Sequence, residues 1–131
     1  HTGTYIETSQ HKCDNNILLT DFPLKTFYSK CKVVCLRNFK ESIVTLEVVE
    51  SEISKNSMVL NEGENFIIST GWGLNHKSNE YLSLSPSFEP KLMDWLTQKK
   101  IKILGVDTPS VENFENPYQP INTLFQQENI Y

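Results

Sequence analysis

Short apolar runs separated by polar segments restrict this chain to a fold built around β-strands. Runs rich in β-forming residues occupy 31–36, 41–49, 66–70 and 101–106, and such runs are typical of buried strands. Residues 89–99 instead place apolar side chains at helical spacing, with Pro90 tolerated in the first turn. Shorter helices are predicted at 50–55, with Ser51 as the N-cap, and at 121–127. This order of elements predicts an α/β fold with a mixed sheet and few helices.

Polar clusters follow two of these strands directly. Thr-Gly-Trp-Gly stands at 70–73 and Asp-Thr-Pro-Ser at 107–110. Ligands of α/β proteins bind at the carboxyl ends of strands, so we expect the two clusters and the N-terminal segment to meet at one site. Asp107 either orients a residue of that site or accepts backbone hydrogen bonds in the turn before Pro109, and the turn role is favoured.

The first eleven residues place potential metal ligands close together. In an extended strand His1, Tyr5 and Glu7 share one face, and Gly3 leaves room for an approaching group. Imidazole nitrogen and carboxylate oxygen are suitable ligands for a divalent metal. The alternative is an exposed polar segment whose histidines, His1 and His11, have no function.

Length and charge limit the class of protein. A chain of 131 residues with a hydrophobic fraction of 38% predicts one domain, 1–131, with a real core. The net charge of −4 gives no electrostatic reason to expect nucleic acid or a membrane surface as a partner. No apolar run approaches the roughly 20 residues that span a bilayer. Because the chain begins at His1 rather than methionine and ends on a strand-like 129–131, we expect truncation at both ends.

The cysteines indicate a reducing environment. An odd count of three, Cys13, Cys31 and Cys35, argues against a disulfide framework and predicts a cytoplasmic location. Cys35 lies inside an apolar run, which predicts a buried structural thiol.

Three stretches together resemble the cyclase family of metal-dependent hydrolases. Residues 1–11 read His-Thr-Gly-Thr-Tyr-Ile-Glu-Thr-Ser-Gln-His, which is similar to the family signature His-x-Gly-Thr-His-x-Asp-x-Pro-x-His. Residues 66–73 resemble the family's strand followed by Thr-Gly-Trp, and residues 103–110 resemble its Gly-Ile-Asp-Thr-Pro-Ser. The order and separation of the stretches also fit, so the resemblance covers nearly the whole chain.

The resemblance implies a swivelling β/β/α architecture, assembly into homodimers or larger homo-oligomers, and hydrolysis of an aromatic amide. It also implies one or two zinc or manganese ions, which lower the pKa of bound water. His1 matches the first metal ligand, Glu7 a ligand aspartate and Tyr5 a ligand histidine. His11 matches the residue that moves the proton. Trp72 matches an apolar wall beside the substrate; the alternative, packing of this side chain in the core, is slightly favoured from the residues alone.

The chain departs from the family signature at three positions. Tyr5 replaces a histidine, Glu7 is one methylene longer than aspartate, and Ser9 replaces proline. A neutral phenol is a poor zinc ligand. Two hypotheses therefore stay open: a metal-dependent amide hydrolase, or a degenerate member that binds a small ligand or partner without turnover.

Overall fold

Three parallel strands form the central sheet of the structure, a computed structural model that describes residues 3–9 and 18–112. Strands β1 (Cys31–Cys35), β3 (Asn65–Ser69) and β5 (Leu104–Val106) lie side by side in that order. A second sheet pairs β2 (Ile43–Val44) with β4 (Ser87–Phe88), and every pairing among the described residues is parallel. The strands predicted at 31–36 and 66–70 are confirmed. The strand predicted at 101–106 is shorter than expected, and β4 was not predicted.

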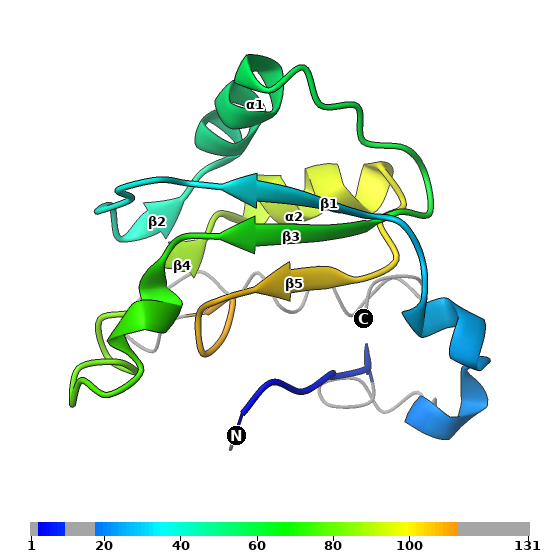
Figure 1. Cartoon of the computed structure of the whole chain (residues 1–131), viewed down its shortest axis with the longest axis horizontal. Coiled ribbons are helices and arrows are strands. Elements are labelled where there is room, and N and C mark those ends of the chain that lie inside the picture. The colour runs from blue at the N-terminus through cyan, green and yellow to red at the C-terminus, as the bar shows by residue number, and fades with distance from the viewer. Residues whose placement is uncertain (1–2, 10–17, 113–131) are drawn as a thin grey trace.

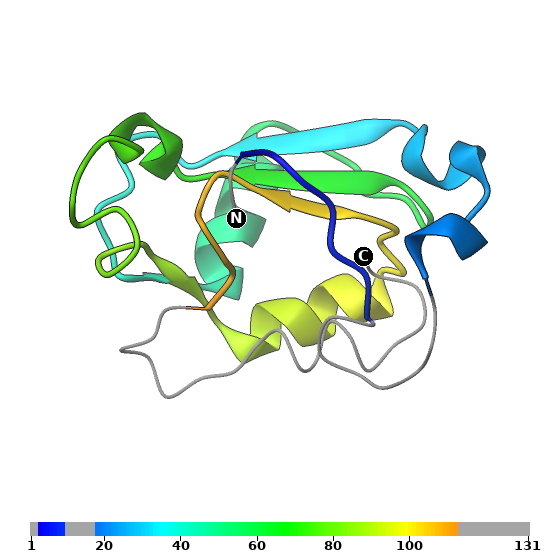
Figure 2. The same cartoon turned by 90° about the horizontal axis from the view of Figure 1, so that it is seen from below.

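Two helices connect the strands of the central sheet and cover the same face of it. Helix α1 (Leu46–Lys55) lies between β1 and β3 in the chain, and α2 (Pro90–Gln98) lies between β3 and β5. Because both crossovers advance in the same direction along the sheet, a right-handed path places both helices on one side, as Figure 2 shows. Short 3-10 helices η2 (Leu19–Asp21), η3 (Leu24–Phe27) and η4 (Trp72–Asn75) complete the described elements. Within residues 3–9 and 18–112, no helix has the length and apolar character needed to cross a bilayer.

The prediction of a strand through residue 49 is wrong, because α1 begins at Leu46. Thr45 is the N-cap, and its side-chain oxygen accepts a hydrogen bond from the Val48 N–H at 3.4 Å. The Glu89 carboxylate accepts a second bond from the Leu46 N–H at 2.9 Å. Ser51, the predicted N-cap, therefore lies in the middle of the helix.

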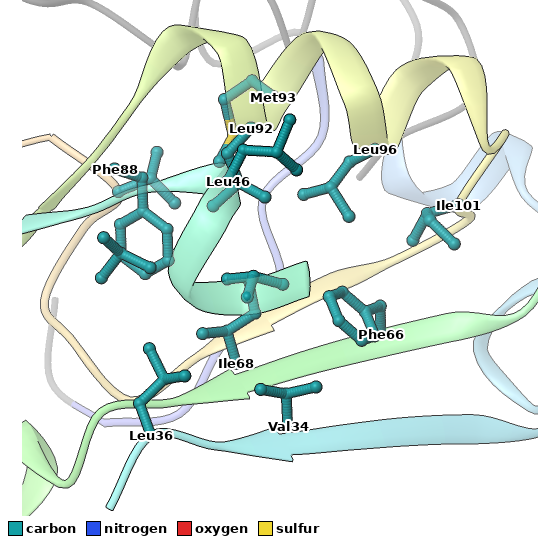
Figure 3. Close-up of a cluster of buried hydrophobic side chains, with 13 residues drawn as sticks. Val34, Leu36, Leu46, Phe66, Ile68, Phe88, Leu92, Met93, Leu96 and Ile101 are labelled. Atoms are coloured by element: carbon teal, nitrogen blue, oxygen red, sulfur yellow. The ribbon is translucent and has the colours of Figure 1, made fainter. Parts of the chain in front are cut away.

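The hydrophobic core fills the space between the sheet and the two helices. Phe66 and Ile68 point from β3 toward the helices, and Leu92 and Leu96 of α2 face them; all four are fully buried (Figure 3). Burying such side chains contributes about 1.5–3 kcal/mol each. The sheet is therefore held rigidly from its helical side, and its strand ends are fixed points for a site.

The opposite face of the sheet is only partly covered by the described residues. Val33 remains 46% exposed and Ile67 37% exposed. Cys35 is also exposed, so the prediction that it is a buried thiol is wrong. The reason is the alternation of a strand: Val34 points to the core, and its neighbours point away from it.

Candidate functional site

A cluster of hydrogen bonds joins the carboxyl ends of β3 and β5, which lie side by side in Figure 1. The Oδ1 atom of Asp107 accepts bonds from the Thr70 N–H and the Thr70 hydroxyl, both at 2.8 Å. Its Oδ2 atom accepts bonds from the Gly71 N–H at 2.7 Å and the Ser69 hydroxyl at 3.1 Å. We call these four residues the Asp107 cluster. The two polar segments at 70–73 and 107–110 meet here, as the sequence predicts.

The favoured role of Asp107, as an acceptor within its own turn, is wrong. Its carboxylate bonds to residues that follow β3, which lies beside β5 in the sheet. Other residues close the local turn: the Thr108 hydroxyl donates to the Ser110 carbonyl at 2.7 Å, and the Ser110 side chain accepts from the Glu112 N–H at 3.2 Å. Asp107 therefore orients a neighbouring segment.

The environment of Asp107 favours its ionised form. Partial burial opposes the charge, but the hydrogen bonds from Thr70, Gly71 and Ser69 outweigh burial and hold the pKa of the Asp107 carboxyl below its ordinary value. The carboxylate is therefore ionised at neutral pH.

Trp72 begins η4 directly after the Asp107 cluster. Gly71, the N-cap residue, has a φ of 82°, a left-handed conformation that glycine adopts at little cost. The indole Nε1–H of Trp72 donates to the Tyr81 carbonyl at 3.0 Å. The two rings are stacked, with centroids 6.5 Å apart and planes inclined by 10°. Trp72 is half-buried, so it packs on Tyr81 and also retains exposed surface.

The N-terminal segment, residues 3–9, runs past β5 at the edge of the sheet opposite β1 (Figures 1 and 2). Tyr5 is 45% exposed, Glu7 is half-buried, and Ser9 is buried. Partial burial, the nearby Glu7 carboxylate and the Tyr81 phenol raise the pKa of Tyr5, in that order of importance. The Glu7 carboxylate and the Tyr81 phenol are thus near enough to Tyr5 to influence the pKa of its phenol.

The described donors alone do not fit a divalent-metal centre. Glu7 offers an ordinary carboxylate ligand, whereas the Tyr5 phenol, with its raised pKa, is neutral at pH 7. Within the part of the chain that the structure describes, no three His, Cys, Asp or Glu residues are grouped to hold a metal ion. His1 and His11, the other predicted metal-binding and proton-transfer residues, lie outside the described residues.

Two members of this site, Tyr81 and Ser69, are not predicted from the sequence. Tyr81 was not singled out, although an aromatic residue shortly after a Thr-Gly-Trp-Gly segment is the type of residue that stacks on a tryptophan. Ser69 is predicted only as a strand residue. It follows Ile68, which is buried, and neighbouring side chains of a strand point to opposite faces, so this position indicates that Ser69 faces away from the core.

Comparison with known proteins identifies the family. Residues 1–113 match the Cyclase family model, described as "Putative cyclase". The chain belongs to the cyclase family. It is 24% identical over 117 residues to a kynurenine formamidase of Bacillus thuringiensis subsp. konkukian (strain 97-27), a match that covers 88% of this chain and 51% of that protein. A kynurenine formamidase of Bacillus anthracis is 23% identical over the same length and the same shares.

Solved structures show the same cyclase-like α/β fold. An isatin hydrolase bound to the product analogue thioisatinate superposes with a TM-score of 0.73 and 15% identity, covering 94% of this chain and 54% of that one. A structure described as a "potential metal-dependent hydrolase with cyclase activity" gives a TM-score of 0.71 and 18% identity, covering 98% of this chain and 59% of that one. The family resemblance and the predicted fold class are therefore confirmed. The chain spans about half the length of the curated relatives that it matches.

Proposed function

We propose that this cyclase-family chain carries the site of a hydrolase that cleaves the carbon–nitrogen bond of an aromatic amide. The names of its relatives support this class, since a formamidase and an isatin hydrolase both act on an amide attached to an aromatic ring. One observation of this structure carries the proposal. The Asp107 carboxylate fixes the segment that leads to Trp72, and the N-terminal segment with Tyr5 and Glu7 runs past the neighbouring β5 (Figures 1 and 2).

The aromatic pair supplies the surface for the substrate ring. Trp72 is held on its Nε1 side by Tyr81, so its ring plane is fixed before a ligand arrives. Aromatic rings gain about 0.5–1.5 kcal/mol from offset-stacked or edge contacts beyond the burial of their area. An aryl amide seated against Trp72 would bring its carbonyl group toward the N-terminal segment.

The residues of that segment provide the polar contacts. The protonated Tyr5 phenol can donate a hydrogen bond to the amide carbonyl oxygen, which gains negative charge as water adds to the carbon. His11, by resemblance, takes the proton from that water and returns it to the departing nitrogen. The carbon–oxygen bond forms, the carbon–nitrogen bond breaks, and the products are a carboxylic acid and an amine.

The proposal extends to a divalent metal, zinc or manganese, as the cofactor of this hydrolase. One solved structure of this fold is described as a potential metal-dependent hydrolase, and His1 and Glu7 stand where the family motif has ligands for zinc or manganese. Tyr5 does not fit such a centre, so no step above depends on a metal ion. A second candidate function follows from the same observation: a member that binds aryl amides without hydrolysing them.

Hydrolysis assays on the natural protein separate the two candidates. Isatin and formanilide serve as cyclic and formyl aryl amides, each assayed with added Zn²⁺, with added Mn²⁺ and with a chelator. The hydrolase proposal expects turnover that falls about 100-fold in His11→Gln, the usual contribution of a general acid–base. His76→Gln is the matched control, since His76 is exposed and contacts the Gly73 carbonyl. Binding of both probes without turnover under every condition would favour the second candidate.

A further inference from the structure

The Asp107 carboxylate has no acceptor capacity left for chemistry. An ionised carboxylate offers about four lone-pair positions. Two hydrogen bonds reach Oδ1 and two reach Oδ2, all from residues 69–71. A group that is occupied in this way does not take up protons from a substrate or coordinate a ligand. Its contribution is to hold the segment that donates to it.

Thr70 transmits the position of Asp107 to Trp72. The Thr70 hydroxyl donates its proton to Asp107 Oδ1 at 2.8 Å and accepts a bond from the Trp72 N–H at 3.2 Å. The Thr70 residue is buried, so water does not readily replace either partner. The Thr70 oxygen therefore links Asp107 to the Trp72 N–H by hydrogen bonds, beside the direct bond from the preceding Gly71 N–H to Asp107 Oδ2.

The Trp72 ring is then held at a second point. Its backbone N–H is fixed by Thr70, and its indole N–H is fixed by the Tyr81 carbonyl. A shift of the backbone at residues 70–72 would move one of these two points relative to the other, and so tilt the indole away from its nearly parallel stacking on Tyr81. The orientation of the aromatic pair thus depends on the Asp107 cluster.

We propose that Asp107 is a positioning residue, which acts through the Thr70 hydroxyl to set the Trp72–Tyr81 pair against which the ring of the ligand binds. The proposal rests on the proposed function in one respect, namely that an aryl amide binds at Trp72. In this role Asp107 contacts neither the aryl amide nor the water that attacks it. The four hydrogen bonds of the Asp107 cluster and the relay through Thr70 carry the proposal.

The test compares variants of the natural protein labelled with 5-fluorotryptophan. The Trp72 and Trp95 resonances in ¹⁹F NMR are assigned by their loss in Trp72→Phe and Trp95→Phe. Thr70→Val removes the relaying hydroxyl while keeping the shape of the side chain, and Thr70→Ser retains that hydroxyl. Thr70→Val and Asp107→Asn are expected to shift or broaden the Trp72 resonance and to weaken isatin binding about tenfold. Thr70→Ser is expected to leave both measurements near the wild-type values.

Glu64→Gln is the matched control for a loss of stability alone. The Glu64 carboxylate also accepts a backbone hydrogen bond, from the Asn61 N–H at 3.0 Å, but it lies just before β3, at the end of that strand away from Trp72. It is expected to change neither the Trp72 resonance nor isatin binding. The Trp95 resonance should stay unchanged in all variants, because Trp95 packs on Phe66 from α2.

The proposal is overturned if Thr70→Val and Asp107→Asn behave like Glu64→Gln, with the Trp72 resonance and isatin affinity unchanged. It is also overturned if Thr70→Ser disturbs Trp72 as much as Thr70→Val does. If Asp107→Asn does not fold, the two Thr70 variants decide the question alone. Failure of the proposed function gives a different result: isatin does not bind the wild-type protein, while the Trp72 resonance still reports on the relay.

Discussion

Asp107 and Thr70 lie 37 positions apart in the sequence, yet one carboxylate oxygen of Asp107 accepts both the N–H and the hydroxyl of Thr70 at 2.8 Å. Such a double contact fixes the two parallel strand ends relative to one another. It converts two separate polar segments into one rigid support for Trp72.

Asp107→Asn is expected to destabilise the fold by about 2 kcal/mol, since hydrogen bonds to a charged group contribute about 1.5–3 kcal/mol. An amide in place of the carboxylate loses the charge and turns an N–H₂ group toward donors such as the Gly71 N–H. Unfolding in urea at pH 7 measures the change. Glu62→Gln is the control: its ion pair with Lys100 is exposed, and its loss should cost about 0.5 kcal/mol or less. Equal effects of the two substitutions would contradict this account.

The stability of the fold is expected to fall in acid in a way that depends on Asp107. The folded-state pKa of this carboxyl lies below the ordinary value, which is about 3.9 for an unfolded chain. The unfolded state therefore binds protons first as the pH falls, so the stabilisation is complete above about pH 5 and is lost progressively below about pH 4. Urea unfolding between pH 7 and pH 2.5 should show a steeper loss for the wild type than for Asp107→Asn. Parallel profiles over the whole range would contradict the assignment.

The strands that lead to the site were predictable because their apolar runs are short, rich in β-formers and followed at once by polar residues. The start of α1 was not, since Val44, Leu46 and Val48 alternate as strand residues do. The competing signals were the Thr45 cap and a bond from the distant Glu89, and the second exists only in the folded chain. Cys35 was misplaced for a related reason: an apolar run does not reveal which face of a sheet the helices cover.

The sequence predicts which segments come together at the site, but it does not predict the hydrogen bonds between them. The motif order identified Trp72 and Asp107, and parallel strand ends brought them together. The direction of the Asp107 bonds, across to Thr70 instead of into its own turn, depends on strand order. His1 and His11 lie outside the described residues, so their roles stay predictions. The ligand role of Glu7 and the substrate contact of Trp72 also stay predictions.

Thr45→Ala is expected to cost about 1 kcal/mol of stability, the usual effect of removing an N-cap oxygen. Ser51→Ala is the matched control, because Ser51 lies exposed within α1, where alanine is the better helix former. Its effect should be neutral or slightly stabilising. Thermal unfolding of both variants measures the difference in stability. A larger loss of stability in Ser51→Ala than in Thr45→Ala would contradict Thr45 as the N-cap and favour a helix that begins at residue 51. Isatin binding should be the same in both.

Tyr5→His is expected to raise the affinity for Zn²⁺ at least about tenfold, since imidazole is a common zinc ligand and a neutral phenol is not. Glu7 would then stand two residues from a second ligand on the same face of an extended segment. Titration calorimetry and elemental analysis of the purified protein give affinity and stoichiometry. Tyr5→Phe is the control and should bind zinc no better than the wild type. Full zinc occupancy in the wild-type protein would contradict the view that Tyr5 weakens the centre.

Gly105 and Ile67 are expected to show strong energetic coupling, because the Ile67 side chain lies over the position where a Gly105 side chain would stand. A Cβ atom added at Gly105 would come within 2.8 Å of Ile67 Cγ1, a contact that forces a local shift and costs about 1–3 kcal/mol. Ile67→Ala removes that atom, so the double variant should be less unstable than the sum of the single changes.

Val33→Ala is the matched control. Val33 pairs with Ile67 on the same exposed face, but none of its atoms is among those nearest the Gly105 position. Urea unfolding measures Gly105→Ala, Ile67→Ala, Val33→Ala and the two double variants that combine Gly105→Ala with each of the others. Effects should be additive for the Val33 pair, with a coupling of about 1 kcal/mol or more for the Ile67 pair. Additive effects for both pairs would mean that β5 moves freely enough to absorb the added methyl group.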